Sequence, residues 1–121
     1  MKRPEQTLHI QVANYLRVAL RPPTFWTSIE HATKLGPVAA AMRKKRGVKA
    51  GLPDVLIMHP DVDTVVVGIE LKAAKGTQSP AQFAMQSDFD KAGAAYFICW
   101  DVEGVASVLK SCGIPLHAKL S

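Results

Sequence analysis

Residues 51–72, GLPDVLIMHPDVDTVVVGIELK, constrain the fold more than any other stretch because they carry the pattern of a β-hairpin. An apolar run, VLIM, is followed by a polar link and then by VVVGIEL, whose β-branched residues favour a buried strand. The middle of the link lies near Val62. If the two runs pair antiparallel about that point, Asp54 falls opposite Glu70.

The charges at this end of the hairpin have an ordinary explanation and a functional one. Directly opposed side chains lie about 4.5–5.5 Å apart at Cβ, so two facing carboxylates repel unless a cation lies between them. Lys72 shares a face with Glu70, roughly 6–7 Å along the strand. The three side chains are either solvated charges at strand ends or the parts that hold Mg²⁺ against a phosphate. Glu70 interrupts an apolar run, where an unpaired charge is expensive, and this favours the second explanation.

The order of these motifs resembles a known nuclease family. Pro53-Asp54, a hydrophobic strand and then Glu70-x-Lys72 look like the PD-(D/E)xK nuclease superfamily. More closely, GVKAGLPDVLI followed by GIELKAAKGTQSPAQ resembles the VRR-NUC domains, including the short stand-alone kind of phages and bacteria. The added G-x-PD and the downstream S-x-x-Q make the likeness specific, and it extends from the first predicted helix to Tyr96.

The resemblance implies a metal-dependent DNA endonuclease that hydrolyses phosphodiester bonds. Asp54, Glu70 and the backbone carbonyl of Leu71 would ligate Mg²⁺ or Mn²⁺, since hard cations prefer oxygen ligands. Lys72 would hold the attacking water or stabilise charge on the phosphorus. In the family an acidic residue on the first helix helps to complete the metal site, and Glu5 is the matching position. Its charge near a helix N-terminus also has an ordinary explanation in the helix macrodipole.

Gln82 has two explanations as well. Ser79, Pro80 and Gln82 form the pattern of a capping box with proline at the first helical position, which explains the glutamine without chemistry. In the resembled family a glutamine at this place lies at the active site, where its amide would orient water or phosphate. Phe83 and Phe89 are expected to bury the inner side of this helix.

Basic residues dominate the segment that leads into the hairpin. No acidic residue occurs between His31 and Pro53, and the formal net charge of the chain is +5. The segment is either a solvated basic face or a surface that contacts the nucleic-acid backbone, which supplies affinity without reading sequence. The predicted contact residues, with one from the turn after the hairpin, are Arg43, Lys44, Lys45, Arg46, Lys49 and Lys75.

The remaining pattern predicts an α/β domain with a small mixed central sheet flanked by helices, a restriction-endonuclease-like core over residues 1–121. Helical periodicity, together with residues that start or stop helices, predicts helices over 3–20, 37–46, 79–91 and from Asp101 to about 112. Strands are predicted over 25–29 and 95–100 in addition to the hairpin. The last strand follows a helical crossover and should therefore lie parallel to the strand of Glu70.

Composition narrows the cellular setting. Two cysteines do not make a disulfide framework, and Cys99 lies in an apolar run, so a reducing compartment is expected. The N-terminal residues lack the apolar region of a secretory signal, and no apolar stretch approaches the ~20 residues needed to cross a bilayer. We therefore expect a cytoplasmic protein without a membrane partner.

Substrate and assembly follow only by analogy. The stand-alone relatives look like junction-resolving enzymes, which implies branched or junction DNA as partner and a symmetric homodimer. The alternatives are a non-catalytic nucleic-acid-binding module on a nuclease fold, or a nuclease of flaps or single strands. The roles of four further polar residues stay open at this point, namely His9, Glu30, His31 and Gln86.

Overall fold

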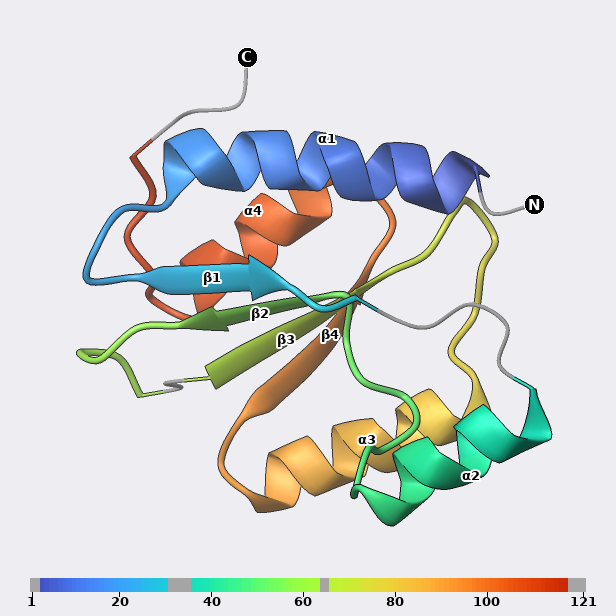
Figure 1. Ribbon diagram of the computed structural model, residues 1–121. Coiled ribbons are helices and arrows are strands. Elements are labelled where there is room, and N and C mark those ends of the chain that lie inside the picture. Colours follow the sequence, from blue (N-terminus) through green and yellow to red (C-terminus); the bar gives the residue numbers. More distant parts are fainter. Residues whose placement is uncertain (1–2, 31–35, 64–65, 118–121) are drawn as a thin grey trace.

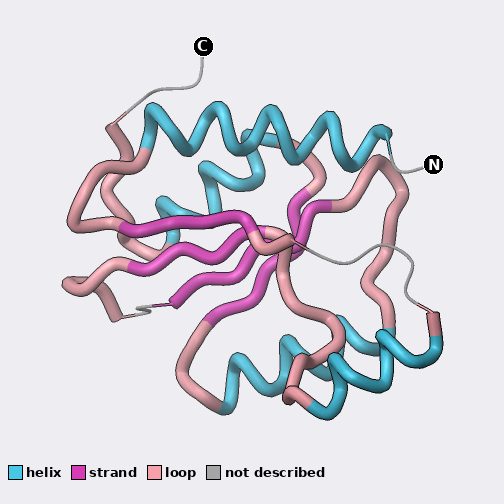
Figure 2. The backbone as a smooth tube through the Cα atoms, in the orientation of Figure 1, coloured by secondary structure: helices cyan, strands magenta, loops and turns pink. Residues whose placement is uncertain are grey.

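The computed structural model describes residues 3–30, 36–63 and 66–117, which form four helices and four strands (Figures 1 and 2). The elements are α1 (Arg3–Ala19), β1 (Phe25–Ser28), α2 (Pro37–Lys45), β2 (Val55–Met58), β3 (Val66–Leu71), α3 (Pro80–Lys91), β4 (Ala95–Cys99) and α4 (Val102–Ser111). Their order and type are those predicted from the sequence, and each boundary lies within one or two residues of the predicted one.

The strands form one mixed sheet in the order β1-β2-β3-β4. β1 and β2 are antiparallel, β2 and β3 form the predicted hairpin, and β3 and β4 are parallel. Val55 pairs with Ile69 and Met58 with Val66, so the hairpin is centred on Val62 as predicted. β3 and β4 are parallel because α3 returns the chain to the end of the sheet at which β3 begins, and β4 starts from there.

Helices lie on both faces of this sheet. Figure 1 shows α1 and α4 over one face and α3 on the other. Leu8, Val12 and Leu16 follow a four-residue spacing on α1 and are buried in a core with alternate residues of β3. On α4, Val105 and Leu109 are also fully buried in this core. The periodicity of each element thus decides which of its faces is covered.

The inner face of α3 differs from the predicted one. Met85 is buried and Phe89 is half-buried, with its ring edge-on to Tyr96 at a centroid distance of 5.4 Å, whereas Phe83 is 62% exposed. The prediction that Phe83 is buried was therefore wrong. Met85 and Phe89 are four residues apart and share one face of the helix, and Phe83 is offset from the middle of that face by about 140° because successive residues turn by ~100°.

Helix α2 is the exception to this packing. None of its residues is buried, and Val38 and Met42 are 77% and 46% exposed. Its last turn carries Arg43, Lys44 and Lys45. The helix therefore gains little from burial against the rest of the described chain, and its surface is available for a partner. Among the described residues, no helix is long and apolar enough to cross a membrane.

Candidate active site

The hairpin brings two carboxylates together at the ends of β2 and β3. Its register, continued by one residue, places Asp54 opposite Glu70. The backbone amide of Asp54 donates to the carbonyl of Ile69 at 2.9 Å, and Asp54 Oδ2 accepts a hydrogen bond from the Leu71 amide at 2.7 Å. Asp54 is thus held on both sides of Glu70 by backbone groups of β3. The predicted juxtaposition of the two acids is confirmed.

Glu70 is a buried charge in a central strand. The residue is only 5% exposed, and its Oε1 accepts no hydrogen bond from the part of the chain that the structure describes. Burial raises the pKa of Glu70 to about 7, with further upward contributions from the charge of Asp54, a hydrogen bond to Asp54 and the charge of Glu5. Lys72 acts in the opposite direction. Lys72 therefore offsets only part of the cost of a charge at Glu70.

Lys72 lies on the same side of β3 as Glu70, as predicted. Its Nζ is 3.6 Å from Glu70 Oε2, and its side chain is 14% exposed. The β3–β4 pairing continues as far as the Lys72 amide, which donates to the carbonyl of Cys99 at 3.0 Å. The ammonium group thus stands at the rim of the site on a backbone fixed by the sheet, where it can reach an anion from solvent.

Glu5 approaches the same place from α1. It is half-exposed, and its charge raises the pKa of Glu70, although by less than burial or Asp54 does. Over residues 3–30, 36–63 and 66–117, no three His, Cys, Asp or Glu side chains are gathered closely enough to hold a metal ion. Glu5 is therefore a neighbour of the carboxylate pair rather than a third member of one tight cluster.

The loop that delivers Asp54 is held by a residue whose role the sequence did not indicate. Tyr96 is 2% exposed, and its hydroxyl donates to the carbonyl of Gly51 at 2.9 Å. Burial and the charges of Glu70 and Asp54 raise the pKa of this phenol, so it stays a donor. Gly51 has φ +82°, and a Cβ there would collide with the backbone carbonyl of Ala81. No local pattern predicts this contact, because it joins three segments that are distant in the sequence.

Gln82 occupies the capping box that its spacing predicted. Its side-chain Oε1 accepts from the backbone amide of Ser79 at 2.9 Å, and the backbone amide of Gln82 donates to Ser79 Oγ at 3.2 Å. Gln86, left open in the sequence, receives a hydrogen bond from Gln78 Nε2 at 2.9 Å and donates to the Tyr96 carbonyl at 3.2 Å. The Gln86 amide therefore joins α3 to the loop that precedes it through its oxygen and to β4 through its nitrogen. The catalytic role of Gln82 stays a prediction.

The other candidate residues have diverse settings. His9 Nε2 is 2.8 Å from Ser28 Oγ, a contact that joins α1 to β1. Glu30 is exposed, and His31 lies outside the described residues. Of the predicted backbone-contact residues, Arg43 is partly exposed, and the rest are exposed: Lys44, Lys45, Arg46, Lys49 and Lys75. The structure therefore gathers Asp54, Glu70 and Lys72 with Glu5 nearby, and leaves the basic residues at the surface.

The donor set suits a hard divalent cation. Two carboxylates face each other, and a buried carboxylate oxygen, Glu70 Oε1, has no donor among the described residues. A cation would remove the repulsion and satisfy that oxygen, and all the nearby ligands are oxygens of the kind that Mg²⁺ and Mn²⁺ prefer. With few protein ligands, water would complete the shell, which is usual for Mg²⁺. The residues present therefore fit the metal that the resemblance implies.

Comparison with known proteins agrees with this architecture. No family model matches the chain, and none of the curated proteins matches its sequence. Two solved structures are similar to it over most of their length. One, described as a VRR_NUC domain protein, has a TM-score of 0.64 and 23% identity over 90% of this chain and 87% of its own. Another, described as a VRR_NUC domain, has a TM-score of 0.57 and 15% identity over 88% of this chain and 95% of its own. The chain therefore has the fold of a VRR-NUC domain, a nuclease fold.

Proposed function

We propose that the protein is a metal-dependent endonuclease that hydrolyses phosphodiester bonds in DNA, with a structure-specific substrate. The observation that carries the proposal is the arrangement around Glu70. A buried carboxylate faces Asp54, has an oxygen without a donor among the described residues, and lies 3.6 Å from the Lys72 ammonium. A site built only for stability would not place an acid in a central strand opposite a second acid at the start of its neighbour, because each lowers the stability of the other.

Asp54 and Glu70 are the residues that would hold Mg²⁺ or Mn²⁺, with the carbonyl of Leu71 as a third ligand and Glu5 as a further contributor. When bound, the ion supplies a Lewis acid that polarises the phosphate and lowers the pKa of a water. Asp54 is already oriented by the Leu71 amide, so little ordering is needed before it binds. The half-exposed Glu5 would contribute from the rim of the site, by accepting hydrogen bonds from water.

Lys72 supplies the positive charge for the reacting phosphate. Its Nζ is at the mouth of the site and carries donors that can contact a phosphate oxygen or the attacking water. The ion pair with Glu70 keeps the Lys72 ammonium directed at the carboxylates, while the part of the ammonium that does not face Glu70 is open to solvent. Gln82 sits at the N-terminus of α3, and its side-chain NH₂ is the group available to orient water, since its Oε1 serves the cap.

The basic surface of α2 and the following loop is the proposed backbone contact. Arg43, Lys44, Lys45 and Arg46 are consecutive, and Lys49 follows just before the Gly51 turn that leads to Asp54. Phosphate contacts of this kind give affinity that falls steeply with salt and carries no sequence information. Lys75, in the turn after β3, adds a further exposed positive charge near Lys72.

We further propose that the protein forms a symmetric homodimer and acts on branched or junction DNA. Its support is analogy with the stand-alone relatives together with the uncovered apolar side chains of α2, Val38 and Met42. Size-exclusion chromatography with light scattering at micromolar concentration tests the assembly, and a monomer in that experiment would contradict the proposed homodimer. Cleavage of junction, flap, single-stranded and duplex DNA in one panel tests the substrate.

The experiment for the activity uses Lys72→Ala. The variant and the parent protein are incubated with plasmid and branched DNA in Mg²⁺ or Mn²⁺, and then with EDTA. We expect metal-dependent cleavage by the parent, none by the variant, and similar DNA binding by both, because Lys72 makes one contact among many basic residues. Cleavage by the variant at the parent rate would refute the role of Lys72. Binding by the parent without metal-dependent cleavage would instead favour a non-catalytic binding module.

A further inference from the structure

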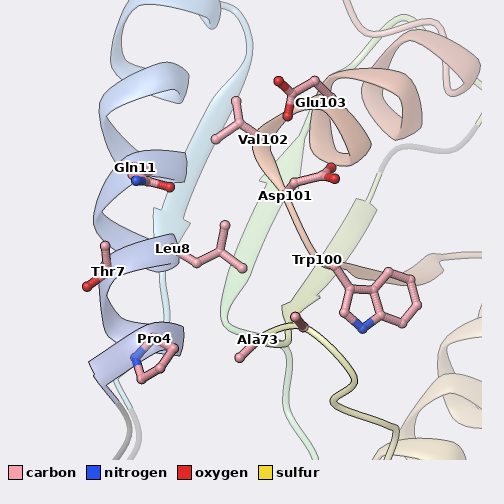
Figure 3. A pocket seen from close by; sticks show the side chains of 10 residues that line it. Pro4, Thr7, Leu8, Gln11, Ala73, Trp100, Asp101, Val102 and Glu103 are labelled. Atoms are coloured by element: carbon pink, nitrogen blue, oxygen red, sulfur yellow. The ribbon is translucent and has the colours of Figure 1, made fainter.

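Trp100 lies next to Lys72 at the edge of the sheet, on the face that carries the candidate active site. Leu71 pairs with Cys99, and the Lys72 amide donates to the Cys99 carbonyl at 3.0 Å, so the register continued by one residue makes Lys72 and Trp100 neighbours. Because successive side chains of a strand alternate, both lie opposite the core face of Leu71 and Cys99. Figure 3 looks into the hollow between α1 and the start of α4, and it shows the indole pointing away from α1. Trp100 therefore belongs to the side of Glu70 and Lys72.

The turn after β3 fixes the orientation of the indole. Trp100 Nε1 donates to the carbonyl of Gly76 at 2.9 Å, and the Gly76 amide donates to the Ala73 carbonyl at 2.8 Å, which closes the turn. A Cβ at Gly76 would lie 3.0 Å from Lys72 Cβ, so this turn also rests against the Lys72 side chain. One hydrogen bond thus joins the indole to the segment that borders the proposed catalytic lysine.

Much of the ring is left uncovered. Trp100 is 49% exposed, whereas tryptophan is well buried on average. Its polar atom is engaged, so the exposed part is aromatic carbon, which gains free energy when a partner covers it. The hydrogen bond to Gly76 needs only a donor. Support of the turn alone therefore does not account for a side chain this large and apolar at an exposed position.

The charges next to the ring suit a nucleotide as its partner. Lys72 is one strand away, about 4.8 Å at the backbone. Lys75 is exposed in the same turn and has φ +68°, which non-glycine residues seldom adopt. The acid that follows Trp100, Asp101, is engaged at the N-terminus of α4, where its Oδ1 accepts from the Gly104 amide. An aromatic face bordered by ammonium groups matches a base that stacks and phosphates that are anionic.

We propose that Trp100 stacks on an unpaired base of the nucleotide next to the phosphate that is cut. The carboxylate pair lies one to two strand spacings from Trp100, or about 5–10 Å, which is comparable to the reach of a nucleotide from its phosphate to its base. A base inside a duplex is covered on both faces by its neighbours, so the ring stacks only where the duplex is interrupted. Any base fits, because every base has an aromatic face.

This inference rests on the proposed function and narrows its substrate to DNA with an unpaired nucleotide at the cut. The binding test uses a short thymidine oligonucleotide, an abasic oligomer of the same length and charge, and a duplex of that length, all in EDTA. Affinity is measured by anisotropy of labelled DNA. The emission of Trp100 is taken as the difference between the parent and Trp100→Phe, so that Trp26 needs no change.

We expect the thymidine strand to quench Trp100 and to bind about tenfold more tightly than the abasic oligomer, with no quenching by the abasic oligomer or the duplex. Trp100→Ala should reduce the tenfold difference to less than about threefold by weakening the thymidine strand alone. Trp100→Phe keeps an aromatic ring and should retain most of the difference. The comparison of the parent with Trp100→Phe remains readable if Trp100→Ala fails to fold.

The abasic oligomer separates stacking from support of the turn. If Trp100 served only to hold Gly76, Trp100→Ala would weaken the thymidine strand and the abasic oligomer equally, and that result would overturn the inference. A parent protein whose Trp100 emission is not quenched would overturn it as well. The matched control is Phe25→Ala, because Phe25 is 54% exposed at the end of β1 away from Asp54. This control should leave the affinity for both oligomers unchanged.

Binding in EDTA and cleavage in Mg²⁺ keep this inference apart from the proposed activity. Quenching by the thymidine strand without any cleavage would leave the stacking site standing and remove the nuclease. Cleavage by a parent that binds both oligomers equally would do the opposite. In the cleavage arm, one abasic position is moved along a flap substrate. It should slow the parent by about tenfold only beside the cut bond, and Trp100→Ala should show no such dependence on position.

Discussion

The buried charge of Glu70 makes a prediction about stability that does not depend on any substrate. Glu70→Gln keeps the shape of the side chain and removes the charge that faces Asp54. The pKa of Glu70 is raised from 4.5 to about 7 in the folded state, a difference of about 2.5 units. At about 1.4 kcal/mol for each unit, ionising this carboxyl in the folded state lowers the free energy of unfolding by about 3 kcal/mol.

The sign follows from proton binding. Between about pH 4.5 and 7 the unfolded chain loses the Glu70 proton while the folded protein keeps it, so the folded state binds more protons. The free energy of unfolding of the parent should therefore be highest below pH 4.5 for this group and should fall as the pH rises through 7. The variant lacks this contribution, so the difference between the two isolates it from all other titrating groups.

Chemical denaturation in EDTA between pH 5 and 8 measures that difference. We expect Glu70→Gln to be more stable than the parent by about 3 kcal/mol at pH 8, which corresponds to roughly 10 °C in Tm for a chain of this length, and by much less at pH 5. Saturating Mg²⁺ or Mn²⁺ should raise the Tm of the parent at pH 8 but not that of the variant. If the variant is less stable than the parent at pH 8, the account of Glu70 as a carboxylate destabilised by its burial and by Asp54 is refuted.

Three further variants test the supports of the site. Tyr96→Phe removes the donor to the Gly51 carbonyl and should lower stability by about 1–3 kcal/mol in denaturant and slow cleavage, with DNA affinity unchanged in a binding assay. Gly68→Ala should lower stability by about 1–3 kcal/mol, because its Cβ would lie 2.7 Å from Pro53 Cγ and 2.9 Å from Phe89 Cε2; an unchanged Tm would contradict this packing. The double variant Lys45→Ala, Arg46→Ala should reduce the dependence of DNA affinity on salt by about 0.9 in log–log slope for each lost phosphate contact, at unchanged Tm, whereas Lys91→Ala with Lys110→Ala should not.

Most of the fold followed from local pattern. The hairpin register was predictable because its two apolar runs are arranged symmetrically about Val62, and a slip by one residue would have turned Glu70 into the hydrophobic core. The caps at Ser79 and Asp101 were predictable because capping depends on residues three apart. The face of α3 was not, since the partner of Met85 and Phe89 lies on β4 and no spacing within the helix identifies it.

The candidate site also has a part that the sequence predicts and a part that it does not. Asp54, Glu70 and Lys72 belong to one hairpin, so their meeting could be read from strand alternation alone. The hydrogen bond from Tyr96 to Gly51 and the position of Trp100 over the turn at Gly76 join segments that are distant in the chain. A single sequence carries no signal for such contacts. An aromatic residue just after a buried parallel strand was a hint for Trp100, because side chains at the carboxyl ends of such strands often line binding sites.

Strand alternation also explains how one end of β3 can serve both the hydrophobic core and the candidate site. Successive residues of a strand point to opposite faces of the sheet. Glu70 and Lys72 share the face of Tyr96 and α3, where the oxygen ligands and the ammonium meet a phosphate. Leu71 and its neighbour Cys99 on β4 pack into the core under α1 and α4. Trp100 follows Cys99 and lies on the other side, where its indole donates to the Gly76 carbonyl beside Lys72. The backbone of β3 therefore separates the apolar core from the proposed phosphate chemistry, and a change on one face need not alter the charge balance on the other.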